Sequence, residues 1–395
     1  MAPSAVDVLP EAEVIESGNR LETKATADGS TFREPLKYSG SLDEYESFDV
    51  TNVIGKEFPA LQLSQILSDD TKIRDLAITG TTTRYLQTCM ADVDSHPVSQ
   101  RGVVFFRNQD LTIDDQKLLG QKLGELTGKP KTSKLHKHAL LNSKRGLSVD
   151  ENGRVDDEIS IISSEQNRRL YEDRYKVASK HLASEGWHAE YVKVDENITF
   201  ERVPSDYAIL KIVQPPEDAG GDTLWASGYE AYDRLSPAFK KLAESLTATH
   251  YQPEFNRTAA KYGIELIDDE RGAPENKGLD FQATHPVVRT NPVTGWKSLF
   301  GAGGQVKNGW IDDVSPRESE VLKEYFLQVV TSNHDLQVRF KWGKDDLAVW
   351  DNRSVFHTAT NDYYGSRQGN RVVSLGEKPY FDPSSVSRRE AQAKS

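Results

Sequence analysis

Two stretches near the C-terminus, LAVWDNRSVFHTATNDY (residues 347–363) and RQGNRVVSLGEKPYF (residues 367–381), decide the fold. Each contains a short run of β-branched and aromatic residues, and Gly, Asn and Asp separate the runs, which is typical of neighbouring strands. Two helical stretches, 229–246 and 315–333, precede them. Further runs of the same strand type lie at residues 207–214, 221–228, 281–290 and 298–301. Many short strands with few helices predict an α+β fold with a double-stranded β-helix core, the jelly-roll or cupin-like arrangement, and flanking helices.

The first half of the chain indicates supporting elements and the domain limits. Residues 98–126 predict a strand, a turn and a helix with an acidic first turn, and residues 156–167 predict a strand that leads into a charged helix. Residues 1–35 are polar and have no periodicity, so we expect a disordered or loosely attached arm. We therefore predict a single domain over residues 36–384 and a short tail over residues 385–395.

The composition limits the class of protein. Hydrophobic residues make up 36% and charged residues 28% of the chain, and there is no run of about 18 apolar residues, so we expect no membrane-spanning helix and no membrane partner. The N-terminus has no basic start followed by an apolar core, so we expect no secretory signal. The single cysteine, Cys89, excludes a disulfide framework and a zinc–thiolate cluster and favours a cytoplasmic location. The net charge of −12 argues against binding of nucleic acid.

Two of the nine histidines are candidate metal ligands. His188, in GWHAE, is followed two positions later by Glu190, and such residues project to the same face of a strand. His357 follows the strand AVWD far along the chain and could complete a site with them. Two histidines and one carboxylate on one face leave three coordination positions open, which is the facial triad of non-haem Fe(II) oxygenases.

A candidate site for a carboxylate accompanies the metal ligands. Arg367 and Arg371 follow His357 in the next strand. A carboxylate co-substrate needs a fixed, bidentate cation at the end of its pocket, which an arginine here can supply. Thr223, in AGGDTLWAS, is a strand hydroxyl after a glycine turn and could donate to the same carboxylate.

These residues occur within stretches that resemble the TauD/TfdA family of taurine- and alkylsulfonate-type 2-oxoglutarate dioxygenases, in a fungal-type branch. The resemblance extends from Tyr38 to Pro383 and includes GWH, ITFERVPSDYAILKI, AGGDTLWASGYEAYDRLS, THPVVRTNPVTGWKSLF and the two stretches quoted first. It implies a dioxygenase that uses Fe(II), 2-oxoglutarate and O₂ to hydroxylate a small anionic substrate bearing a sulfonate or carboxylate, forming succinate and CO₂.

The resemblance implies individual roles at the metal and at the co-substrate. His188 and His357 look like the two iron histidines, and Glu190 stands in the place of the carboxylate ligand. Thr223 and Arg367 look like the residues that bind the distal carboxylate of 2-oxoglutarate.

The resemblance also implies residues for the substrate. Arg371 is similar to the arginine that faces the substrate anion in sulfonate-using members, next to the co-substrate clamp. His138, in LHKHALL, and Phe200 look like further substrate-contacting residues. Trp225 and Trp350 look like core aromatic residues.

The chain departs from the family pattern at the carboxylate ligand. The family pattern is WHxD followed directly by a strand like ITFE, whereas here the carboxylate is Glu190 and residues 189–197 contain an insertion before ITFE. Asp195, inside that insertion, is the competing carboxylate ligand. A halogenase would need a small residue in place of the carboxylate, and two acids stand nearby. A second insertion, residues 80–97, is either a flexible surface loop or a translated intron.

Other classes of protein stay open at the level of the sequence. A catalytically impaired cupin-like protein that binds a metal or ligand would keep the fold but would not need the arginine clamp. A zinc hydrolase could also use two histidines and one acid, together with a general base beside the metal-bound water. The identity of the substrate and assembly into a homo-oligomer, either a dimer or a tetramer, stay open too.

We predict that Glu190 rather than Asp195 binds the iron. A two-residue step from His188 along a strand needs no loop closure, whereas Asp195 needs the chain to turn back at an entropic cost. Glu190→Ala is expected to lose Fe(II) affinity and succinate formation, and Asp195→Ala to keep both. The reverse pattern would transfer the ligand to Asp195, and normal Fe(II) binding by both variants would refute the triad.

Overall fold

The strands of the computed structural model come from both halves of the chain, and the structure describes residues 34–78, 98–147, 152–165, 198–360 and 362–393. The strands are β1 (Phe48–Asp49), β2 (Lys56–Phe58), β3 (Val103–Phe106), β4 (Ser160–Ser163), β5 (Ser205–Gln214), β6 (Thr223–Ser227), β7 (Thr247–Tyr251), β8 (Gln282–Pro286), β9 (Val288–Thr290), β10 (Lys297–Leu299), β11 (Trp310–Ile311), β12 (Gln337–Phe340), β13 (Leu347–Asp351), β14 (Val355–Ala359) and β15 (Gln368–Leu375). The predicted N-terminal arm, the insertion at residues 80–97 with Cys89, and the charged helix after β4 lie largely or wholly outside the described residues.

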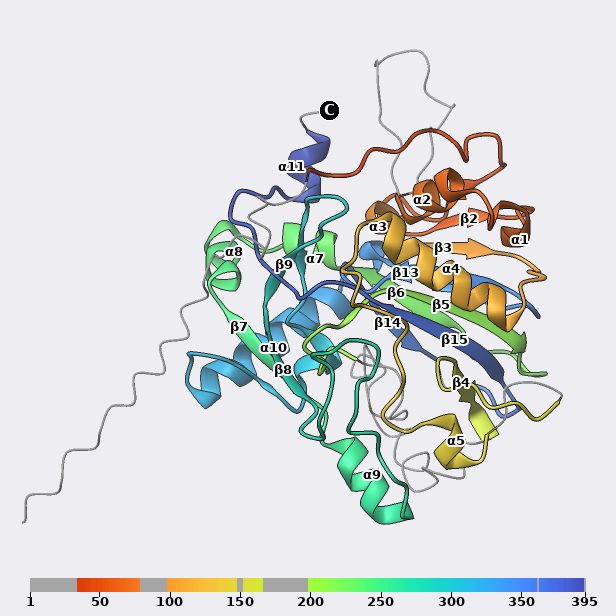
Figure 1. Ribbon diagram of the computed structural model, residues 1–395. Coiled ribbons are helices and arrows are strands. Elements are labelled where there is room, and N and C mark those ends of the chain that lie inside the picture. Colours follow the sequence, from red (N-terminus) through yellow and green to blue (C-terminus); the bar gives the residue numbers. More distant parts are fainter. Residues whose placement is uncertain (1–33, 79–97, 148–151, 166–197, 361, 394–395) are drawn as a thin grey trace, which may run out of the picture. The chain divides into compact units, whose positions relative to one another are not determined.

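The helices flank these strands (Figure 1). They are α1 (Leu63–Ile66), α2 (Asp70–Ile78), α3 (Val98–Arg101), α4 (Ile113–Leu126), α5 (Asn142–Arg145), α7 (Gly228–Asp233), α8 (Pro237–Glu244), α9 (Glu254–Tyr262), α10 (Pro316–Thr331) and α11 (Arg388–Gln392), with 3-10 turns η2 (Gly303–Val306) and η3 (His334–Leu336). None of the described helices is both long and apolar enough to cross a membrane.

A large sheet and a smaller sheet face each other around the core. The large sheet has the order β1-β2-β3-β13-β5-β15-β4, and the smaller one has the order β12-β6-β14. All of their pairs are antiparallel except β2 with β3. The main buried cluster draws apolar side chains from both sheets, among them Leu210, Trp225 and Trp350. Two facing sheets built from strands distant in sequence are the predicted jelly roll.

The large sheet is buried on both faces, and the residues of β13 show how. Ala348 and Trp350 point into the cluster between the sheets, whereas Leu347 and Val349 belong to a second cluster on the opposite face. The helices α2 and α4 lie over that outer face (Figure 1), and their apolar side chains belong to the second cluster. This double burial explains why the strand is a continuous apolar run rather than an alternating one. The interior of the jelly roll is therefore isolated from solvent on the side of the large sheet.

Helix ends follow local capping rules. The helix predicted over residues 315–333 is confirmed as α10, because Ser315 forms a capping box with Glu318 and Pro316 occupies the first turn. The helical stretch predicted over residues 229–246 is instead two helices, α7 and α8. Ser236 caps α8 directly before Pro237, and this second helix start separates the two.

The strand predicted over residues 281–290 is divided between β8 and β9. The interruption lies at Val287, whose N–H donates to the Leu246 carbonyl at 3.0 Å. The Val287 carbonyl accepts from the N–H groups of Phe300 and Gly301 at 2.7 and 3.0 Å. These bonds transfer the chain from the sheet β11-β7-β8 to the pair β10-β9, and Pro286, which has no N–H for a ladder hydrogen bond, ends β8 directly before the break.

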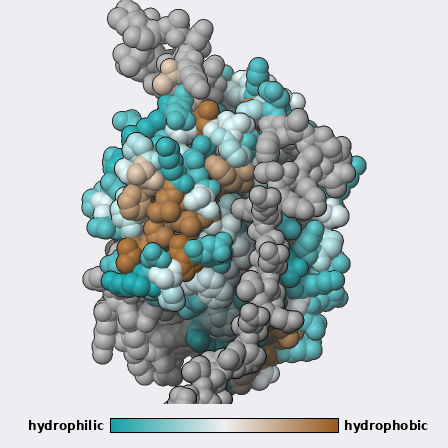
Figure 2. Space-filling model, turned by 90° about the vertical axis from the view of Figure 1, so that its left-hand side faces the viewer, coloured by the Kyte–Doolittle hydropathy of each residue, from teal (hydrophilic) through white to brown (hydrophobic). Residues whose placement is uncertain are grey.

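An apolar patch lies on the face formed by α8 and α10 (Figure 2). Phe239 and Leu242 in α8 are 36% and 39% exposed, and Val321 in α10 is 46% exposed. The rings of Phe239 and Tyr325 join the two helices, with centroids 4.7 Å apart. Exposed apolar groups that gather in this way are typical of interaction surfaces.

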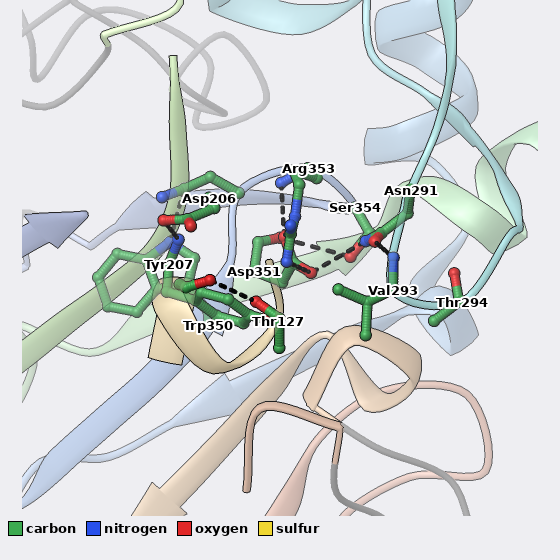
Figure 3. A network of polar contacts seen from close by, with 12 residues as sticks. Thr127, Asp206, Tyr207, Asn291, Val293, Thr294, Trp350, Asp351, Arg353 and Ser354 are labelled. Carbon is green, nitrogen blue, oxygen red and sulfur yellow. Dashed lines mark hydrogen bonds and ion pairs between the residues drawn. The ribbon is translucent and has the colours of Figure 1, made fainter. Parts of the chain in front are cut away.

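A buried charge pair holds the turn from β13 in the large sheet to β14 in the smaller one. Nε and Nη2 of Arg353 donate to the two carboxylate oxygens of Asp351 at 2.7 and 2.9 Å. Nδ2 of Asn291 donates to Asp351 as well, at 2.9 Å. Figure 3 shows Arg353 and Asn291 converging on this carboxylate. The turn therefore joins the two sheets at one fixed point.

We predict that Asp351→Ala lowers the free energy of unfolding by about 3–5 kcal/mol, because it leaves the buried Arg353 guanidinium without its bidentate partner. Glu377 contacts Arg353 through a single 3.5 Å bond and does not replace that geometry. Urea unfolding followed by circular dichroism measures the change.

Glu320→Ala is the matched control for that variant. The Glu320 side chain is 65% exposed and pairs with Lys323 at 2.8 Å, so the expected loss is below about 1 kcal/mol. An Asp351→Ala variant no less stable than this control would contradict the importance of the turn.

Candidate active site

A cavity in the core brings together four of the residues singled out in the sequence: Thr223, His357, Arg367 and Arg371. Its remaining lining comes from Ile162, Leu210, Trp350 and Ala359. These residues belong to strands of both sheets and to the turn before β15. The jelly roll therefore converges side chains on one buried point from segments far apart in the sequence.

His357 reaches the cavity because of the register between β14 and β6. His357 is opposite Trp225, and Ala359 is opposite Thr223, so the three cavity residues of these strands share one face. The His357 side chain is buried, and its ring centre lies 5.1 Å from that of Trp350. Trp350 was predicted as a core aromatic residue, and it also lines the cavity.

Arg367 is fixed by hydrogen bonds on both sides of its backbone and on its side chain. Its N–H donates to Oγ of Ser164 at 2.9 Å, and its carbonyl accepts from the Ser164 N–H at 3.0 Å. Its Nε donates to the carbonyl of Gly221 at 3.0 Å. The turn before β6 needs glycine, because a side chain at Gly220 would lie 2.5 Å from the Asp362 carbonyl oxygen. Only 2% of Arg367 is exposed, so its guanidinium is a buried, oriented cation.

Arg371 lies four residues further along the chain, in β15. It is opposite Leu210 of β5 and Ser160 of β4, and it is buried. An even step along a strand places both arginines on the same face. The irregularity in the pairing leaves this alternation intact, because the extra residue, Val213, belongs to β5. Two guanidinium groups therefore face one cavity and favour anionic ligands there.

His138 and Phe200 lie in an aromatic cluster rather than in the lining of this cavity. Both rings contact Phe255 edge to face, with centroids 5.0 and 5.2 Å apart. Nδ1 of His138 accepts the N–H of Leu140 at 3.1 Å. Their contacts with a substrate stay a prediction. The candidate ligands His188, Glu190 and Asp195, and the insertion at 189–197, lie outside the described residues, and no three-ligand metal cluster occurs within them.

Buried histidines that sequence reasoning missed hold the segment leading into β5. Nε2 of His285 donates to the carbonyls of Thr199 and Glu201 at 2.8 and 3.1 Å. Nδ1 of His250 is 2.8 Å from the Thr199 hydroxyl. Phe200 lies between the two clamped residues and is thereby fixed. The only signal in the sequence was a histidine in the otherwise strand-like run THPVV.

A buried ionic group anchors the same segment. Nε and Nη2 of Arg271 donate to the Glu201 carboxylate at 2.6 and 2.9 Å, and Nε2 of His136 lies 3.3 Å from it. Burial by itself would raise the pKa of Glu201, but the hydrogen bonds from His136 and Arg271 outweigh burial and hold that pKa below its ordinary value. Burial lowers the pKa of His136. The nearby charges of Arg271 and Arg371 lower this pKa further, whereas Glu201 raises it.

Burial lowers the pKa of His285 to about 4, and the charge of Arg289 acts in the same direction. In the unfolded chain the His285 imidazole therefore takes up a proton near the ordinary histidine pKa of about 6.5. In the folded chain it stays neutral until the pH is much lower. The stability that this neutral imidazole contributes is complete above about pH 6.5 and is lost as the pH falls toward 4.

We predict that the free energy of unfolding falls between pH 7 and pH 5, with His285 responsible for about 2 kcal/mol of the loss. In His285→Gln, whose amide can still donate to the two carbonyls and does not titrate, the pH 7 to pH 5 difference is expected to shrink by that amount. Urea unfolding at both pH values measures it. An unchanged difference in the variant would show that other groups cause the acid sensitivity.

A jelly roll whose core cavity holds a histidine and two buried arginines is suited to binding a small anion. Residues 94–374 match the family model described as "Taurine catabolism dioxygenase TauD, TfdA family". The chain is 44% identical to the alpha-ketoglutarate-dependent dioxygenase btcD of Neocamarosporium betae, over 91% of this chain and 99% of that one. The chain belongs to the TauD/TfdA family.

More distant similarities agree with that assignment. The chain is 29% identical to an alpha-ketoglutarate-dependent sulfonate dioxygenase of Saccharomyces cerevisiae, over 72% of this chain and 60% of that one. Among solved structures it is similar to AAD-2 in complex with Mn(II) and N-oxalylglycine, with a TM-score of 0.56 and 19% identity over 85% of this chain and 99% of that one. The fold class and the enzyme class predicted from the sequence, an Fe(II)- and 2-oxoglutarate-dependent dioxygenase, are confirmed, which argues against the zinc-hydrolase alternative.

Proposed function

We propose that this dioxygenase hydroxylates a small organic anion bearing a sulfonate or a carboxylate, with 2-oxoglutarate and the substrate held by different arginines. The observation that carries the proposal is the convergence of Thr223, His357, Arg367 and Arg371 on one cavity. The donor set fits the reactants: an imidazole for the metal, and guanidinium and hydroxyl donors for carboxylates.

Arg367 with Thr223 is the proposed site for the distal carboxylate of 2-oxoglutarate. Arg367 is held by Ser164 and by the Gly221 carbonyl, so its guanidinium meets a carboxylate without reorganising. Thr223 is the first residue of β6 and lies two residues after Gly221, whose carbonyl binds Arg367. These two donors would hold one carboxylate of the oxoacid and would leave its keto acid end free for the metal.

His188, Glu190 and His357 are the proposed ligands of Fe(II), with Asp195 as the competing carboxylate. The bound iron would supply the oxidation of a C–H bond by O₂, with 2-oxoglutarate converted to succinate and CO₂. The protein positions the two organic reactants and excludes water from the buried cavity.

Arg371 is the proposed contact for the anionic group of the substrate, with His138 and Phe200 completing that side. The sulfonate dioxygenase among the relatives supports a sulfonate as one substrate class. We further propose a cytoplasmic protein, based on its single cysteine, and an assembly of two or four copies, for which the patch of Phe239, Leu242 and Val321 offers a surface.

We predict that Arg367→Ala raises the KM for 2-oxoglutarate by more than about a hundredfold and the KM for the organic anion far less. Removing one partner of a buried carboxylate–arginine pair costs about 3–5 kcal/mol. Succinate formation, measured with taurine, hexanesulfonate and hexanoate as trial substrates, gives both constants.

Arg371→Ala is the matched control, since it removes the second guanidinium of the cavity, four residues further along the chain in β15. It is expected to raise the KM for the organic anion and to leave that for 2-oxoglutarate within a few-fold. The opposite pattern would show that the two arginines have exchanged roles. No stimulation of succinate formation by any of the anions would overturn the proposed substrate class.

A further inference from the structure

Thr223 accepts a hydrogen bond from a buried tryptophan. The indole N–H of Trp342 donates to Oγ1 of Thr223 at 3.0 Å, and the two residues are only 7% and 4% exposed. An indole nitrogen can donate but cannot accept, whereas a hydroxyl has one hydrogen and two acceptor positions. The direction of this bond is therefore fixed, and the hydroxyl hydrogen of Thr223 is left to point elsewhere.

The surroundings of Trp342 hold its ring in place. The ring packs edge to face on Phe340 with centroids 5.0 Å apart, and it contacts Trp225 at 6.2 Å. The chain leaves Trp342 through a turn in which the N–H of Gly343 donates to Asp346 at 2.7 Å. Phe340 is also the residue opposite Thr223 in the β12–β6 pair. The positions of Trp342 and Thr223 relative to each other therefore depend on the register of β12 against β6.

We infer that Trp342 is a positioning residue that makes Thr223 a hydrogen-bond donor toward the cavity. Thr223 lines the cavity together with Arg367, so its remaining hydrogen is available to an anionic oxygen bound there. The bond from Trp342 excludes the orientation in which the Thr223 hydrogen points at the indole, so the hydrogen stays available for a carboxylate oxygen on the cavity side. The inference rests on the proposed binding of the distal carboxylate of 2-oxoglutarate by Thr223 and Arg367.

The consequence is selectivity for an oxoacid that carries a second carboxylate. A donor in this position does not add to the affinity for a ligand that chelates the metal but has no distal carboxylate. Trp342 therefore acts on the affinity for 2-oxoglutarate and not on the affinity for oxalate, which chelates a metal but lacks the distal group. A merely structural role of Trp342 would affect both ligands.

The test is Trp342→Phe, which keeps an aromatic ring and removes the N–H. Isothermal titration calorimetry of the Mn(II)-loaded protein gives the Kd of 2-oxoglutarate and of oxalate without turnover. We expect the Kd of 2-oxoglutarate to rise about tenfold, since hydrogen bonds to charged groups are among the stronger ones. The Kd of oxalate is expected to stay within twofold. Equal weakening of both ligands, or of neither, would overturn the inference.

Trp225→Phe is the matched control from the same aromatic group. Among the described residues, no acceptor lies within hydrogen-bonding distance of Trp225 Nε1, so its loss removes an indole without removing a hydrogen bond. Its ratio of the two Kd values is expected to match the wild type. In a Thr223→Val background, Trp342→Phe is expected to change that ratio no further, and an additional tenfold change there would place the effect outside Thr223.

Two further variants keep the inference testable if Trp342→Phe does not fold. Thr223→Ser retains a hydroxyl that Trp342 can orient and should bind 2-oxoglutarate within threefold of the wild type, whereas Thr223→Val should lose about tenfold. Equal losses in both would count against the inference. Failure of the proposed function looks different, because Arg367→Ala would then bind 2-oxoglutarate normally.

Discussion

β6 lies between β12 and β14, and this double pairing decides which side chains reach the cavity. Opposite Thr223 stand Phe340 on one side and Ala359 on the other. A slip of one residue on either side would turn the facing side chains toward the opposite surface of the sheet. Such a slip of β14 would move His357 out of the cavity. The register of three short strands is thus the constraint on which the site depends.

Burial on both sides makes that register robust. The inner face of the smaller sheet contributes Trp225 to the central cluster, and its outer face contributes Ala226 and Phe356 to the cluster beneath α7 and α10. Slippage would exchange these two sets. The turn after β13 adds a directional restraint, because Asp351 binds Arg353 in a bidentate manner and takes a third bond from Asn291. Apolar packing drives the two sheets together, and the buried Asp351 carboxylate selects one alignment of their strands.

Much of this arrangement could be predicted from local sequence, and the parts that could not have long-range causes. Strand runs, the α10 cap and the spacing of Arg367 and Arg371 are local signals. The start of α8 was signalled by Ser236 and Pro237, and the prediction of one continuous helix overlooked it. Pro286 was a local signal for the break at Val287, whereas the clamp by His285 depends on partners that are distant in the chain. No local pattern encodes such partners.

The two ends of the site are built from different kinds of structure. The proposed oxoacid end consists of β6, the turn before it and the residue before β15, all tied to the sheets by backbone bonds. The proposed substrate end involves His138 and Phe200, which lie outside the regular strands and meet through Phe255 of α9. Segments of that kind vary more readily than a paired strand does. The rigid end can therefore keep one co-substrate while the other end changes, so one fold can serve relatives with different organic substrates.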